Sequence, residues 1–154
     1  MAILEVGIQF RGFVLVSEVF YAVDGAVDVD LRGSLMSAIV SFAEQTFSGD
    51  LQAFTFKKYA LVFGARRVVA KGCRGEEPMV CYAVLDKELK ARARQKVRER
   101  LERLLDAFLK SYAPAENTYH RISEFRGFRP TFAAVLKSTA MKLDDRARQV
   151  LGVG

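Results

Sequence analysis

The residues of this chain that could carry out catalysis or bind a metal are few and far apart. His120 is the only histidine, and Cys73 and Cys81 are the only cysteines. A zinc site or a Cys–His nucleophile needs such groups to converge, and the two cysteines do not form a C-x-x-C motif. We expect His120 to lie at the surface, and we expect no metal and no cofactor.

Two further patterns resemble functional motifs and fail on their spacing. Residues 72–75 contain two glycines, but they match neither G-x-x-x-x-G-K-[ST] nor G-x-G-x-x-G. The adjacent acids at 76–77 and 144–145 lack the separation and shielding that acid/base chemistry requires. The sequence therefore favours a non-enzymatic protein and argues against a GTPase of the phosphate-loop type.

Composition indicates one globular unit with a basic character. The chain has 154 residues, of which 51% are hydrophobic and 27% charged, values that suit a folded core. The net charge is +6. Residues 87–110 hold nine Lys or Arg against four acids, a local charge of +5. Such a balance permits contact with nucleic acid or anionic lipid.

The expected compartment is the cytoplasm, with peripheral contact to a membrane as an option. The apolar runs are too short to span a bilayer, and the start MAILEVGIQF has no basic residue before its apolar stretch. Two cysteines do not make a disulfide framework. A single Asn with 15 Arg against 9 Lys hints at a thermophile.

The strands are predicted from β-branched and aromatic runs between turn residues. Residues 2–22 form a hairpin around Arg11-Gly12, where glycine tolerates a positive φ. Residues 51–71 form two strands joined near Lys57-Lys58. Residues 79–85 are a near-continuous apolar run, which is typical of a strand buried on both faces.

Two helices are predicted between and after these strands. The segment 30–47 carries apolar residues on two sides, so we expect it to be covered on two sides. The segment 87–112 has one apolar stripe, and Pro114 ends it. Its charges predict three stabilising i,i+4 ion pairs, namely Glu88–Arg92, Glu99–Arg103 and Asp106–Lys110. In the tail, Pro130 is placed to begin a further helix whose apolar face includes Phe128 and Phe132.

This element order, with local sequence, resembles the longin domain, a profilin-like α/β sandwich that includes small archaeal proteins. Residues 11–17 stand where such domains have their first hairpin, and Leu31 to Ala43 is similar to the first helix of archaeal members. Residues 51–63 are similar to the following hairpin. The resemblance covers about residues 2–112.

The resemblance implies a fold and a class of function. The fold is α/β (α+β), a five-stranded antiparallel sheet flanked by helices. Residues 1–112 form the longin-like domain, and residues 113–154 a helical C-terminal extension docked on it. Longin-like domains, like the related roadblock domains, are non-enzymatic platforms. They bind small GTPases or scaffold subunits, often as dimers or hetero-oligomers in trafficking-like systems.

The partner surface that we expect is the second stripe of helix 30–47. This stripe consists of Met36, Val40, Ala43 and Phe47. If the first stripe packs on the sheet, the second has no cover within the domain and marks a protein interface. The alternatives are that the C-terminal tail folds over this stripe, or that the stripe is merely exposed.

A basic nucleic-acid-binding protein is the opposing hypothesis. It would use helix 87–110 and the C-terminal tail, where seven Lys or Arg interleave with three Phe. The residues placed to contact an anionic partner are Lys90, Arg94, Arg98, Arg66 and Arg67. Against this, Lys and Arg commonly form a solvated helix face or guard strand edges, and the three Phe favour docking of the tail on the sheet.

Overall fold

The computed structural model of this protein describes residues 3–20, 53–56 and 59–136. The strands are β1 (Ile3–Phe10), β2 (Phe13–Val19), β3 (Ala53–Phe56), β4 (Tyr59–Val68) and β5 (Glu77–Leu85). The helix α2 spans Ala91–Ser111, and the 3-10 helices η1 and η2 span Pro114–Glu116 and Ile122–Phe128. Residues 129–136 continue from η2 as a helix.

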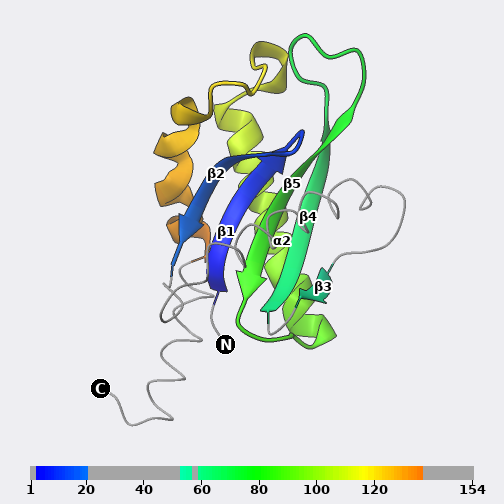
Figure 1. Ribbon diagram of the computed structural model, residues 1–154, viewed down its shortest axis with the longest axis vertical. Helices are drawn as coiled ribbons and strands as arrows, with labels where there is room; N and C mark the ends of the chain where they lie inside the picture. Colours follow the sequence, from blue (N-terminus) through cyan, green and yellow to red (C-terminus); the bar gives the residue numbers. More distant parts are fainter. Residues whose placement is uncertain (1–2, 21–52, 57–58, 137–154) are drawn as a thin grey trace.

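All neighbouring strands are antiparallel, in the order β2-β1-β5-β4-β3 (Figure 1). Two hairpins meet side by side, because β1 pairs with β5 as well as with its sequence neighbour β2. Arg11 and Gly12 have φ values of 53° and 81°, the pair of positive angles that a two-residue hairpin turn requires. The expected α/β organisation, with an antiparallel sheet and helices against it, is confirmed.

One face of the sheet is covered by α2, which crosses β4 and β5 (Figure 1). Its inner side carries five buried residues: Val97, Leu101, Leu104, Leu105 and Phe108. The helix lies close to the sheet at Gly64, where a Cβ would be 3.0 Å from the backbone nitrogen of Glu102. A residue without a side chain at this position of β4 lets the two backbones approach.

The tail covers the rest of the same face, next to β2. Its rings Phe125 and Phe128 lie 5.3 and 5.2 Å from the ring of Phe108 in α2, and Phe128 packs edge-on against Phe132. Arg129 lies 3.8 Å from Glu18 of β2. The described tail therefore shares one hydrophobic core with the sheet, as its three phenylalanines predict.

Three details differ from the sequence-based expectation. The long helix begins at Ala91 and not at residue 87, because the backbone of Lys90 is extended. Glu88 therefore lies before the helix and cannot form a helical pair with Arg92. The tail contains a 3-10 helix at 122–128 that periodicity did not indicate. The third difference concerns the ion pairs of α2 and is described with the site. The predicted helix 30–47 and the short helix after residue 143 lie outside the described residues.

Candidate functional site

The first candidate surface is the face of the sheet opposite α2, called the second face below. Residues directly opposite each other in antiparallel strands point to the same side, so Tyr82 shares this face with Gly7 of β1 and Phe63 of β4. Its apolar residues are Leu61, Phe63, Val80, Tyr82 and Val84. All are buried, yet no described helix lies over them (Figure 1). Side chains of this kind need a further layer to exclude water.

Strand β1 contributes a polar row to this otherwise apolar face. Tyr82 donates a hydrogen bond of 2.7 Å to Glu5, and both side chains are buried. The Tyr82 ring lies directly over Gly7, where a Cβ would come within 2.5 Å of the phenol oxygen. Next along the strand, Gln9 is only 3% exposed and its Oε1 accepts no hydrogen bond. The row thus combines a satisfied carboxylate with an unsatisfied amide oxygen.

These polar positions were not among the expected site residues, although the sequence of β1 contains a pattern that could have pointed to them. Glu5, Gly7 and Gln9 alternate with apolar residues in β1, so they share one face of a strand. An alternating pattern normally places polar residues in solvent. Here that face is buried, and the pairing of β1 with β5 brings the Tyr82 ring over it.

The four residues of the expected partner stripe, Met36, Val40, Ala43 and Phe47, lie outside the described residues. The described tail is not over the second face, since its aromatic side chains pack on α2. The described residues therefore give only indirect information on this stripe, through the buried apolar face of the sheet described above.

The expected anion-contacting residues fall into two groups. Arg66 of β4 donates through Nε and Nη2 to both carboxylate oxygens of Asp106, at 2.9 and 3.2 Å. This hydrogen bonding raises the pKa of the Arg66 guanidinium. Arg98 and Arg66 also lie 3.3 and 3.7 Å from Glu102. These two arginines are thus paired within the molecule at its surface, Arg66 across the seam between α2 and β4 and Arg98 along α2.

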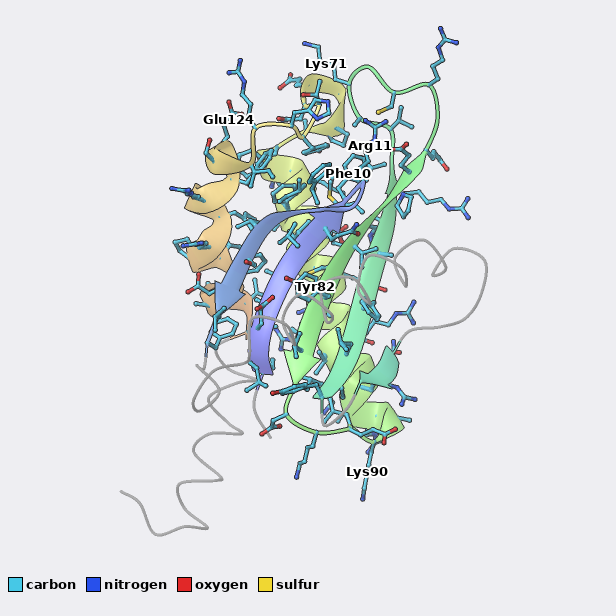
Figure 2. The ribbon with its side chains drawn as sticks, in the orientation of Figure 1. Phe10, Arg11, Lys71, Tyr82, Lys90 and Glu124 are labelled. Atoms are coloured by element: carbon cyan, nitrogen blue, oxygen red, sulfur yellow. The ribbon has the colours of Figure 1, made fainter. Side chains whose placement is uncertain are left out.

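The remaining expected basic residues are near opposite ends of the molecule. Lys90 is exposed at the start of α2, remote from Lys71 and Arg11 (Figure 2). Arg94 lies one turn further along the helix. Arg67 is exposed in β4, 3.9 Å from Glu76. The structure does not gather these residues into one continuous patch.

The predicted ion pairs along α2 are replaced by others. Asp106 binds Arg66 and not Lys110, and Glu99 accepts a 3.4 Å hydrogen bond from Gln95 and not from Arg103. A contact across the seam between helix and sheet holds Asp106 because the Arg66 guanidinium meets both carboxylate oxygens at once.

His120 lies at the rim of an open polar depression of about 350 Å³. Its other charged lining residues are Lys71, Glu116, Arg121 and Glu124. Arg121 and Glu124 pair with each other at 3.5 Å, so part of this charge is neutralised internally. The depression brings no cysteine to His120, and no described cluster of His, Cys, Asp and Glu is arranged to hold a metal.

Both cysteines are unpaired thiols. Cys81 is completely buried in β5, and this burial raises the pKa of its thiol. Cys73 is half-buried in the loop between β4 and β5. A buried thiol with a raised pKa holds its proton and is a poor nucleophile.

Comparison with protein-family models, with curated proteins and with solved structures finds no match to this chain. Among the described helices, none has the length and apolar character needed to cross a bilayer.

Proposed function

We propose that this protein is a non-catalytic protein–protein interaction module of a small-GTPase-associated or trafficking-like system, and that it binds its partner through helix 30–47. The observation that carries the proposal is the second face of the sheet. That face is apolar and buried, while α2 and the described tail are both on the opposite side. The helix predicted at 30–47 follows β2 in the chain and is the element suited to cover it.

The two-sided pattern of this helix then leads to a partner. One stripe of the helix would pack on Leu61, Phe63 and Tyr82, whose side chains are buried. The other stripe, with Met36 at its start and Phe47 at its end, would face away from the sheet. Contiguous apolar side chains on an outward face mark an interface. The partner is a second copy of this chain or another protein, with a small GTPase as the candidate that the family resemblance implies.

We also propose that the fold is the five-stranded longin- or profilin-like sandwich. Two strands joined by a tight turn, three further strands, and then a long helix on one face support this assignment. The unpaired thiols of Cys73 and Cys81 support a reducing compartment such as the cytoplasm.

The proposal is tested by comparing Met36→Asp with Ser37→Asp. Both variants add one carboxylate to the same helix, but only the first adds it to the proposed interface. Light scattering should give at least a dimer for the wild type and Ser37→Asp, and a folded monomer for Met36→Asp. In pull-downs from native lysate, the partner would be a protein that the wild type and Ser37→Asp both retain and that Met36→Asp loses.

The contrary result is equally clear. If the wild type is a monomer and Met36→Asp lowers the melting temperature by several degrees more than Ser37→Asp, then Met36 is covered by its own chain. The interface through helix 30–47 would then be wrong.

A further inference from the structure

The charges of α2 are distributed unevenly around the helix, and the structure shows which side of the helix faces β4 and which faces the core. Glu102 and Asp106 both contact Arg66 of β4, so they define the flank of α2 that faces β4. The buried residues of the helix, among them Leu101 and Leu104, define its inner side. At about 100° per residue, the flank opposite Glu102 carries a different set of side chains.

That opposite flank is basic. It consists of Lys96, Arg100 and Arg103, and Arg92 continues it one turn earlier on the outer side of the helix. We call these four residues the basic flank. Arg92, Lys96 and Arg103 are exposed and Arg100 is half-buried. In the part of the chain that the structure describes, the ion pairs of α2 involve Arg98, Glu102 and Asp106 and none of these four. Two acids on the helix lie next to this flank: Glu99, which accepts a hydrogen bond from Gln95, and Asp106, three residues after Arg103, which is held by Arg66.

We propose that the basic flank binds the surface of an anionic membrane. Four Lys or Arg side chains grouped on one side of a helix are enough for such a contact, because each adds about fivefold to the partition onto an acidic bilayer. Arginine contributes more than a point charge here, since its guanidinium can donate two hydrogen bonds to one phosphate. Membrane binding would be independent of the protein interface proposed above, because α2 is on the other side of the sheet (Figure 1).

The geometry favours a flat anionic surface over a nucleic acid. From Arg92 to Arg103 the flank extends for about 16 Å along a straight helix, at about 1.5 Å per residue. A lipid surface can meet the whole length of such a row. A duplex strand winds through about half a turn around its axis in the same distance. Single-stranded nucleic acid needs exposed aromatic rings for stacking, and the aromatic residue within α2, Phe108, is fully buried.

The experiment compares two charge reversals of equal size. The test variant is Lys96→Glu/Arg103→Glu, on the basic flank, and the control is Lys71→Glu/Arg74→Glu, in the exposed loop between β4 and β5. Both lower the net charge by the same amount and change only exposed residues. Binding is measured by co-sedimentation with vesicles of phosphatidylcholine alone and with added phosphatidylserine, at low and high salt. A short DNA duplex is titrated in parallel.

The wild type should bind the vesicles that contain phosphatidylserine and not those of phosphatidylcholine alone, and high salt should weaken this binding. The test variant should lose at least tenfold in partition, while the control should stay within about twofold of the wild type. Glu99→Gln should bind more tightly than the wild type, because it removes the acid next to the flank that no arginine holds.

Three results would overturn the proposal. Absence of wild-type binding to acidic vesicles would exclude the membrane. An equal loss in test and control variants would make binding a property of net charge alone. Tighter binding to the duplex than to vesicles, lost in the test variant only, would assign the flank to nucleic acid instead.

Discussion

At the scale of single residues, the structure depends on side chains whose role is set by one close neighbour. Gly7 is in a central strand with the ring of Tyr82 directly over it, and Tyr82 in turn donates to Glu5. Tyr119 adopts a φ of 58°, which is uncommon for a residue with a side chain. Its burial and the 2.7 Å hydrogen bond from its hydroxyl to the Tyr112 carbonyl oxygen hold it there.

The first prediction concerns Gly7→Ala. The added Cβ would lie 2.5 Å from the phenol oxygen of Tyr82, so the ring must move and its bond to Glu5 must lengthen or break. We expect a loss of about 1–3 kcal/mol in the free energy of unfolding, measured by chemical denaturation. The control is Gly75→Ala, which has open space around its Cβ. Equal stability of both variants would show that Tyr82 does not pack on Gly7.

The second prediction concerns the pH dependence of stability. Desolvation raises the pKa of Tyr119 from 10.0 to about 12. Its hydroxyl therefore ionises at a lower pH in the unfolded chain than in the folded one. The stability that this hydroxyl adds to the folded state is complete below pH 10 and is lost as the pH rises to about 12. The wild type should exceed Tyr119→Phe in stability at neutral pH. That difference should shrink by about 1 kcal/mol across this interval. A constant difference would contradict a raised pKa.

At the scale of elements, the contact between α2 and β4 decides how the helix is seated. Gly64 permits the close approach, and Arg66 on the same strand holds Asp106 and Glu102 on the helix flank. This arrangement also explains why the predicted pair Asp106–Lys110 does not form. Helical spacing predicts which residues can meet within one helix. It does not predict a contact with a guanidinium from a neighbouring strand.

The third prediction is that Gly64→Ala destabilises the protein through the seam between helix and sheet. The new Cβ would lie 3.0 Å from the Glu102 backbone nitrogen and 3.2 Å from the Leu101 Cβ, and backbone atoms cannot give way as a flexible side chain can. A loss of about 1–3 kcal/mol is expected in chemical denaturation. Gly127→Ala is the matched control, because its Cβ would meet only the Tyr112 hydroxyl at 3.9 Å. A loss no larger than that of the control would contradict the close approach.

At the scale of the whole molecule, the described tail and the sheet share one core. Phe125 is completely buried and packs against Phe108 and Tyr112 of α2. The loop after β4 is also tied to the connector after α2, since the backbone nitrogen of Lys71 donates to the carbonyl oxygens of Pro114 and Asn117. Unfolding of the tail therefore has to expose the aromatic end of α2.

The fourth prediction tests this shared core with Phe125→Ala. Removing a buried phenylalanine costs about 3–5 kcal/mol, and we expect this loss in a single thermal transition that both far-ultraviolet and near-ultraviolet circular dichroism report. The control is Phe13→Ala, because Phe13 is 62% exposed at the hairpin turn. Two separate transitions in the wild type would indicate instead that the tail unfolds independently.

Local pattern was sufficient for much of the fold and for part of the site. The turn at Arg11-Gly12, the strands on either side of residues 57–58 and the apolar stripe of the long helix all follow from properties of a few adjacent residues. Turn chemistry and hydrophobic periodicity act within one element, so they can be read without knowing the neighbours. The burial of Phe125, Phe128 and Phe132 was predictable for the same reason, since large rings in a short segment need cover.

What only the tertiary structure decided are the properties that arise between distant elements. Pairing of β1 with β5 brings Tyr82 over Gly7 and against Glu5, and both Glu5 and Gln9 are buried. The approach of β4 to α2 places Arg66 beside Glu102 and Asp106, whereas Arg100 and Arg103 lie on the other flank of the helix, away from this arginine. Sequence alone determined which residues carry charge and which are apolar. Whether a charge meets an opposite charge, a buried strand or solvent depends on which elements the folded chain brings together.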